Sequence, residues 1–226
     1  MQAPLPLPPL APRPPALVRG VANAEALDRI EAWTAAPRTR PLDWITALSG
    51  PEGAGKSILL DHVASTLGVP VRGPGLDVEA VLDGPGRAVV LDDADALDPL
   101  DLFALIEGQA GRGALLLIAG RGRPEGWAGP PGRALPDLLS RLRSVARVSL
   151  APPDEAMLSE LLTAALAARG LRPPLGAVVE AAGRLRREAS APARLADRCA
   201  ELSANGYRKP AALLRDALAA APDLTL

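Results

Sequence analysis

Short apolar runs alternate with amphipathic segments through residues 21–151. The apolar runs predict strands over residues 43–49, 69–72, 88–91, 114–119 and 146–150. Apolar residues at helical spacing predict a helix that starts at Asn23 and further helices over residues 58–68, 77–82, 100–109 and 135–142. Apolar strands that alternate with helices indicate an α/β fold with a parallel sheet that is covered on both faces.

The alternation ends at Pro152 and Pro153, and beyond them every segment has the helical pattern. Helices are predicted over residues 154–169, 175–185, 192–205 and 210–220. We therefore expect three parts: a flexible proline-rich tail over residues 1–20, an α/β domain over residues 21–151 and a small all-α lid domain over residues 152–226.

An octet rich in glycine stands between the first predicted strand and the next helix. It matches the phosphate-loop pattern G-x-x-x-x-G-K-[ST], in which backbone N–H groups and a helix N-terminus face phosphate oxygens. The lysine of this pattern reaches the β- and γ-phosphates. The nucleotide-binding residues predicted here are Gly50, Pro51, Glu52, Gly53, Ala54, Gly55, Lys56, Ser57 and Ile58.

The third predicted strand supplies an acidic partner for the loop, because it ends in Asp92 and Asp93. We expect Ser57 and Asp92 to hold Mg²⁺ and Asp93 to face the γ-phosphate as a second catalytic carboxylate. An ordinary strand-turn-helix would not explain two adjacent carboxylates at the end of an apolar strand. The sequence therefore predicts a site for ADP or ATP with Mg²⁺.

Composition excludes several other classes of protein. The single cysteine among 226 residues rules out a disulfide framework, and the single histidine rules out a cluster of histidine metal ligands. No apolar stretch is long enough to cross a membrane, and no secretion signal is visible, so we expect a cytoplasmic protein without a membrane partner. The net charge of −1 provides no general attraction for nucleic acid.

Two further segments carry a family resemblance. Residues 135–142 (LPDLLSRL) and 148–155 (VSLAPPDE), together with the phosphate loop, resemble the DnaA/Hda family of AAA+ ATPases over residues 23–220. Within that family the likeness is strongest to the Hda type, the regulatory inactivators of the initiator DnaA. The resemblance implies a phosphate-loop AAA+ domain with a five-stranded parallel sheet, followed by the helical lid. It also implies that no dedicated DNA-binding domain follows the lid.

The resemblance also implies partners. Gln2, Leu5 and Leu7 are similar to the short motif with which Hda proteins bind the sliding clamp (β) of DNA polymerase III, with Ala3 where a leucine is commonest. Taken from the residues alone, the same tail is an extended leader with incidental leucines. The family picture adds DnaA as the second partner and a homodimer as a further assembly.

The Ser-Arg-Leu context of Arg141 matches the arginine finger of the family. Such a residue enters the nucleotide site of a neighbouring subunit and stabilises charge on the transferred phosphoryl group. By this resemblance Arg141 acts in trans on ATP held by DnaA.

Two sensor positions depart from the family pattern. Ala119, Gly120 and Arg121 stand where the family has a polar sensor after the fourth strand, so we expect this sensor to be lost. The second sensor aligns with Ser190, with Arg187 and Arg194 near enough to replace it as nucleotide contacts. These departures predict a protein that holds nucleotide but hydrolyses it weakly by itself, which suits a nucleotide-dependent regulator. The resemblance implies that it activates ATP hydrolysis by DnaA.

The preferred hypothesis is therefore a regulator of chromosomal replication initiation. An alternative is a truncated DnaA-like initiator or a helicase-loader AAA+ ATPase acting on DNA, for which Arg121 and Arg123 would supply contacts. A stand-alone phosphotransferase is a third reading, but no acceptor motif is visible. Trp127, within a segment rich in glycine and proline, is expected on a partner surface.

Overall fold

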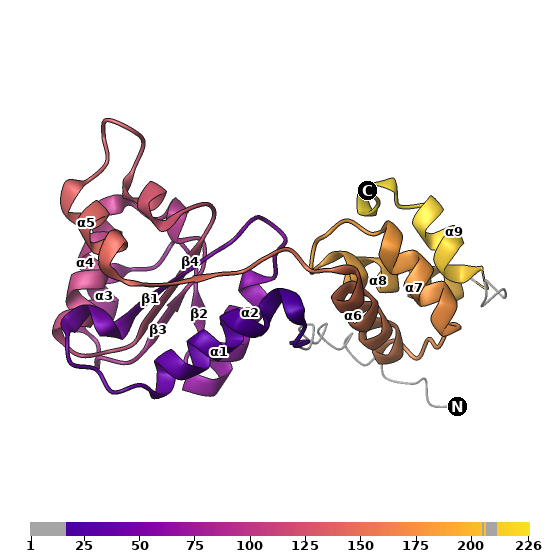
Figure 1. The fold of residues 1–226 in the computed structure, drawn as a ribbon, viewed down its shortest axis with the longest axis horizontal. Helices are drawn as coiled ribbons and strands as arrows, with labels where there is room; N and C mark the ends of the chain where they lie inside the picture. The colour runs from indigo at the N-terminus through magenta and orange to yellow at the C-terminus, as the bar shows by residue number, and fades with distance from the viewer. Residues whose placement is uncertain (1–16, 205, 207–211) are drawn as a thin grey trace, which may run out of the picture.

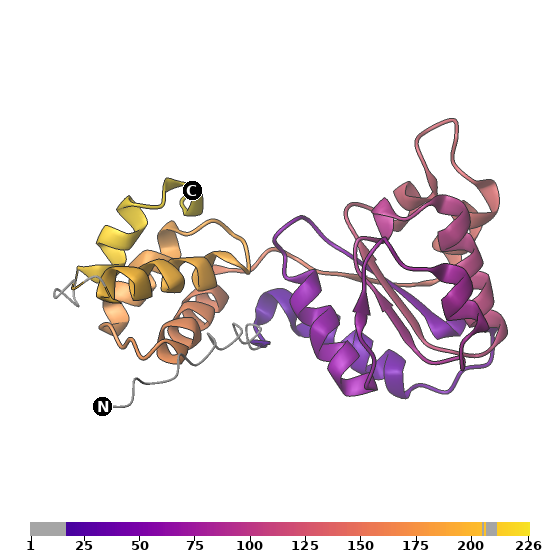
Figure 2. The same cartoon turned by 180° about the vertical axis from the view of Figure 1, so that it is seen from behind.

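The computed structural model describes residues 17–204, 206 and 212–226. The tail residues Gln2, Leu5 and Leu7 lie outside the described residues, as do parts of the last two predicted helices. Figure 1 shows an α/β part that extends from the N-terminal end of the described chain to the last strand and an all-helical part that carries the C-terminus. Figure 2 shows the same arrangement from behind, with a single extended segment leading from the last strand into the helical part.

The α/β part is built on a parallel sheet of five strands in the order β2-β3-β4-β1-β5. The strands are β1 (Ile45–Ser49), β2 (Val71–Arg72), β3 (Val89–Leu91), β4 (Leu116–Gly120) and β5 (Ala146–Ser149). This confirms the predicted fold class. The three inner strands are buried almost throughout, which explains why they read as unbroken apolar runs in the sequence.

Helices cover both faces of the sheet (Figure 1). They are α1 (Val21–Ala35), α2 (Lys56–Leu67), α3 (Val78–Asp83), α4 (Pro99–Gly111) and α5 (Pro136–Ser144). Alternate residues of β4 divide between the two cores: Leu116 and Ile118 pack with residues of α4 and α5, while Leu117 and Ala119 pack with residues of α1 and α2. Because its side chains alternate between the two faces, this one strand packs against the helices on both sides of the sheet.

All five strands are shorter than the sequence predicts, and β1 and β2 each lose two residues at their start. Residues 43 and 44 belong to a 3₁₀ turn, η1 (Pro41–Trp44), and not to the first strand. The turn forms because Pro41 suits its first position and the Asp43 carboxylate accepts hydrogen bonds from the backbone N–H groups of Thr39 and Arg40. At β2, the N–H of Val69 donates to the carbonyl of Ala64 and closes α2, so the strand begins only at Val71.

The expectation that Trp127 lies on a partner surface is wrong. It belongs to the 3₁₀ helix η3 (Pro124–Ala128), and only 3% of its surface is exposed. The indole N–H donates to the carbonyl of Arg121 at 2.7 Å, and the ring packs against Gly120. Tryptophan can be buried here because its one polar atom has a partner.

The helical part contains α6 (Glu155–Ala168), α7 (Leu175–Arg184), α8 (Ala191–Ala204) and α9 (Leu213–Ala219). The carboxylate of Asp154 caps α6 by accepting from the N–H of Met157 at 2.8 Å. The helical part has an apolar core of its own, which includes Cys199. Burial raises the pKa of this thiol to about 11. The 3₁₀ turns η2 (Ala94–Ala96) and η4 (Pro222–Leu224) complete the fold. None of the described helices is long and apolar enough to span a membrane.

Packing at Gly120 generates a stability prediction. A Cβ at this position would lie 2.7 Å from the ring of Trp127 and 2.9 Å from Oδ1 of Asp95, so Gly120→Ala must displace one of them. We expect a loss of about 1–3 kcal/mol in the free energy of unfolding, measured by denaturant titration. Gly111→Ala, in α4 with open space around the added methyl, is the control and should lose nothing. Equal unfolding midpoints for the two variants would contradict the packing argument.

Candidate functional site

The phosphate loop connects β1 to α2. Gly53 and Gly55 adopt left-handed backbone conformations, with φ of 75° and 98°, and Gly55 is the N-cap of α2. Such angles suit glycine, and they allow the loop to turn back over the helix N-terminus. The amine of Lys56 donates to the carbonyls of Gly50 and Pro51, each at 3.0 Å, so the loop itself holds the lysine in place.

The end of β3 meets the first turn of α2. The hydroxyl of Ser57 donates to Oδ2 of Asp92 at 2.6 Å, which brings together the two predicted Mg²⁺ ligands. A hydroxyl and a carboxylate oxygen are donors that Mg²⁺ accepts, with phosphate oxygens and water completing its shell. The residues present therefore fit a nucleotide-bound Mg²⁺.

Asp93 has an unusual backbone conformation. Its φ of 51° makes it the one non-glycine residue with a left-handed conformation in the part of the chain that the structure describes. Its N–H donates to Oδ1 of Asp92 at 2.9 Å. A conformation of this kind costs on the order of 1 kcal/mol and is common at functional sites. The strain allows both carboxylates to stand beside the phosphate loop.

A cavity of about 340 Å³ lies over the loop. It brings together the loop, the two carboxylates, one arginine and two residues of the helical part. The residues that line it are Glu52, Gly53, Gly55, Lys56, Ser57, Ile58, Asp92, Asp93, Arg121, Ala189 and Ser190. Gly50 and Ala54 lie behind this lining: a Cβ on Gly50 would be 2.6 Å from the carbonyl oxygen of Leu150, and Ala54 is buried.

Arg121 is a member of this cavity that sequence reasoning did not assign to it. Its N–H donates to Oδ1 of Asp95 at 3.0 Å, and its carbonyl accepts from Trp127, so its backbone is held on both sides. The guanidinium lies 3.7 Å from the carboxylate of Glu52 and 3.8 Å from that of Asp95. Its place in the sequence could have predicted this, because Arg121 directly follows β4, which pairs with β1.

The helical part touches the loop through its backbone. The N–H of Ala189 donates to the carbonyl of Gly53 at 2.7 Å, and a Cβ on Gly53 would lie 2.6 Å from Cγ of Glu188. Ser190, the position aligned with the second sensor, lines the cavity just before α8. The two arginines of the helical part that were predicted as nucleotide contacts do not line it: Arg187 lies 3.9 Å from Glu155, and Arg194 pairs with Asp223.

Arg141 does not line the cavity of its own chain. It projects from α5 and forms a two-pronged ion pair with Glu107 of α4, with Nε 2.6 Å from Oε1 and Nη2 3.1 Å from Oε2. About 42% of its side chain is exposed. The guanidinium is therefore accessible to another molecule.

Comparison with known proteins identifies the architecture. No protein-family model and no curated protein sequence matches the chain. Domain III of the replication initiation protein DnaA from Thermotoga maritima superposes with a TM-score of 0.72 at 16% identity, covering 92% of this chain and 95% of that one. The chain has the AAA+ fold.

Other solved structures share this fold. The Holliday junction branch migration motor RuvB from Thermotoga maritima matches with a TM-score of 0.65 at 19% identity, over 89% of this chain and 69% of that one. A DNA replication initiation factor matches with a TM-score of 0.54 at 16% identity, over 72% of this chain and 57% of that one.

The contact between Ser57 and Asp92 generates a prediction about Mg²⁺. Ser57→Ala removes the hydroxyl that stands beside the carboxylate, so Mg²⁺ should no longer strengthen nucleotide binding by more than about threefold. The measurement is calorimetric titration with ATP, with and without Mg²⁺. Ser65→Ala, at an exposed position of the same helix, is the control and should behave as the unmodified chain. An unchanged Mg²⁺ effect in Ser57→Ala would remove Ser57 from the metal site.

Proposed function

We propose that this chain is a nucleotide-dependent AAA+ regulator of replication initiation that stimulates ATP hydrolysis by DnaA. The observation that carries the proposal is the combination of a fold like DnaA domain III with an accessible Arg141 outside its own nucleotide cavity. The proposal includes DnaA and the sliding clamp as partners. A homodimer is a further assembly that it allows.

The first step is nucleotide binding by the cavity over the phosphate loop. Lys56 and the loop N–H groups bind phosphate oxygens, and Ser57 and Asp92 orient Mg²⁺, which neutralises phosphate charge when bound. Arg121 exchanges its long contact with Glu52 for a terminal phosphate, since an arginine–phosphate pair is stronger than an exposed ion pair. Lid residues Ala189 and Ser190 close the far side of the cavity. Arg187 and Arg194 remain candidate contacts if the lid moves.

The chain hydrolyses its own nucleotide slowly. Fast phosphoryl transfer also needs an arginine supplied in trans, beyond the cations that bind the nucleotide, because charge develops on the γ-phosphate. Arg141 of this chain lies outside its own cavity and cannot fill that role there. Asp93 can orient a water molecule, but a carboxylate alone does not supply this positive charge. Turnover of ATP by the isolated chain should stay below about 1 s⁻¹.

The second step occurs between proteins. Arg141 leaves Glu107 and enters the nucleotide site of DnaA, where its planar fork fits phosphate oxygens as well as it fits a carboxylate. The exposed pair with Glu107 costs little to break, about 0–1 kcal/mol. The tail residues Gln2, Leu5 and Leu7 tether the chain to the clamp. This part of the proposal rests on the resemblance of the tail to the clamp-binding motif.

A direct test measures ATP hydrolysis by DnaA in the presence of DNA-loaded clamp. The unmodified chain should accelerate hydrolysis by at least about tenfold, and Arg141→Ala should remove the acceleration. A chain lacking residues 1–10 should lose it as well, because it no longer reaches the clamp. Arg143→Ala, an exposed arginine on the same helix, is the matched control and should stimulate normally.

Two outcomes would count against the proposal. Full stimulation by Arg141→Ala would exclude Arg141 as the trans-acting arginine. No stimulation by the unmodified chain, together with salt-sensitive binding to single-stranded DNA, would favour the alternative of a DnaA-like initiator or helicase loader.

The position of Arg121 generates a separate prediction for the isolated chain. Arg121→Gln should weaken binding of ATP by about tenfold and binding of ADP by much less, because the side chain is placed to meet the terminal phosphate. Arg123→Gln, two residues along and outside the cavity lining, is the control. Competition titrations with both nucleotides measure the effect. Equal losses for ATP and ADP would show that Arg121 does not distinguish them.

A further inference from the structure

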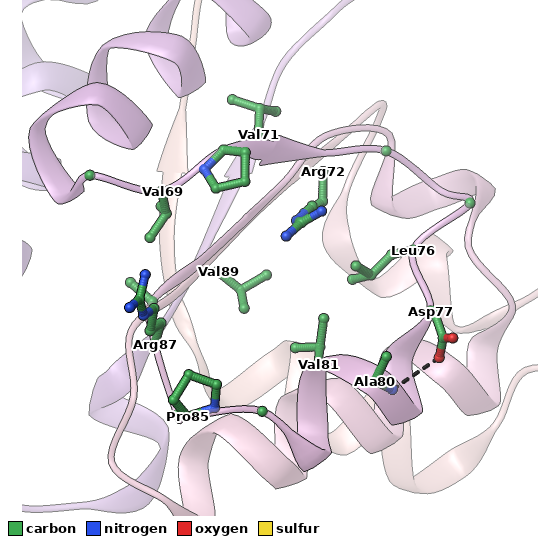
Figure 3. Close-up of a pocket in the computed structure, with 17 residues that line it drawn as sticks. Val69, Val71, Arg72, Leu76, Asp77, Ala80, Val81, Pro85, Arg87 and Val89 are labelled. Carbon is green, nitrogen blue, oxygen red and sulfur yellow. Dashed lines mark hydrogen bonds between the residues drawn. The ribbon is translucent and has the colours of Figure 1, made fainter.

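A second and larger cavity lies at the edge of the sheet. It holds about 700 Å³, against about 340 Å³ over the phosphate loop, and the two cavities share no lining residue. Figure 3 shows it between β2, the short helix α3 and the first residues of β3. Its volume falls within the range of pockets that bind small organic molecules, roughly 300–1,000 Å³.

The groove exists because α3 does not cover the sheet edge completely. The helix has six residues, is capped by the carboxylate of Asp77 and ends at Gly84. The loops on either side contain glycines, and at Gly73 and Gly75 even an added Cβ would meet nothing within 4 Å. The space between helix and edge strand is therefore left open.

The floor of the groove is apolar. Figure 3 shows four aliphatic side chains directed toward its centre, namely those of Val69, Leu76, Val81 and Val89. They come from β3, from α3 and from the segments before β2 and α3. Such a floor favours an apolar ligand body, because removing apolar surface from water stabilises binding.

Two arginines complete the groove. In Figure 3, Arg72 and Arg87 lie on opposite sides of Val89, and both residues line the groove. Neither guanidinium has an ion pair or hydrogen bond with any residue that the structure describes. Asp77 is the one carboxylate that lines the groove, and it accepts the N–H of Ala80. Both positive charges are therefore available to a ligand.

We propose that this groove is a binding site for a small organic anion. The ligand has an apolar body that covers the aliphatic floor and a carboxylate or phosphate group that Arg72 and Arg87 bind. Charge complementarity supports this class, since guanidinium groups match both anions with paired N–H donors. The proposal concerns a site separate from the nucleotide cavity and does not depend on the function proposed above.

A backbone hydrogen bond connects the groove to the candidate nucleotide site. The carbonyl of Arg72 accepts a hydrogen bond from the N–H of Asp92 at 2.8 Å, so β2 is joined directly to the predicted Mg²⁺ ligand. A ligand that orders β2 would therefore act on the backbone of Asp92, whose carboxylate accepts the hydrogen bond of Ser57 beside the phosphate loop.

Three probes with the same body test the proposal: naphthoate, naphthyl phosphate and the uncharged naphthol. Each is titrated into the full chain, followed by the amide resonances of the groove residues, with ADP and Mg²⁺ present to keep the probes off the phosphate loop. At least one anionic probe should shift the groove amides and bind about tenfold or more tightly than naphthol. The tighter of the two identifies the anionic group.

Variants assign the charge to named residues. Arg72→Gln and Arg87→Gln should each weaken the anionic probe severalfold and leave naphthol unchanged, and together they should remove the preference for the anion. Arg143→Gln, exposed on α5 and outside the groove, is the matched control. Equal binding of charged and uncharged probes, or no shift of the groove amides at millimolar probe, would overturn the proposal. This comparison needs only the unmodified chain, so it holds even if a variant fails to fold.

Discussion

The candidate nucleotide site depends on the register between β1 and β4. Ser49 lies opposite Gly120, so the strand that enters the phosphate loop and the strand that leads to Arg121 end at the same level. Asp92, which directly follows β3, lies at the same carboxyl-terminal end of the parallel strands. A shift of one residue along β4 would turn its apolar side chains to the wrong faces and exchange the two cores. The apolar packing on both faces therefore fixes the position of charged groups that do not take part in it.

This dependence explains which features could be predicted from the sequence. The buried strands could be predicted because both faces of the sheet are covered, so nearly every strand residue is apolar. The phosphate loop could be predicted because the geometry of phosphate binding requires glycines and a lysine at fixed positions. The ion pairs of Arg121 beside the phosphate loop cannot be predicted from the sequence, because its partners Glu52 and Asp95 are distant from it along the chain. The burial of Trp127 escapes prediction for a different reason: its hydrogen-bond partner, Arg121, is only six residues away, but a turn and not a periodic pattern brings the two together.

Each of the two arginines that are proposed to bind nucleotide phosphate has a carboxylate nearby in the folded chain. Arg121 lies near Glu52 and Asp95, and Arg141 pairs with Glu107. All these pairs are partly exposed, where an ion pair contributes little to folding. A carboxylate partner keeps each guanidinium oriented and gives way to a phosphate at small cost. The two arginines are thus held ready without adding much to the stability of the fold.

The contact between the helical part and the phosphate loop limits which substitutions the two segments can accept. Gly53 faces Glu188 so closely that a side chain at the loop position would overlap the glutamate, and the adjacent residue Ala189 donates its N–H to the Gly53 carbonyl. The loop glycine is thus constrained by the helical part as well as by its own φ. Positions 53 and 188 cannot vary independently: a larger residue at one requires a smaller residue at the other or a displacement of the helical part. Among relatives of this chain, the two positions should therefore co-vary although they lie in different parts of the fold.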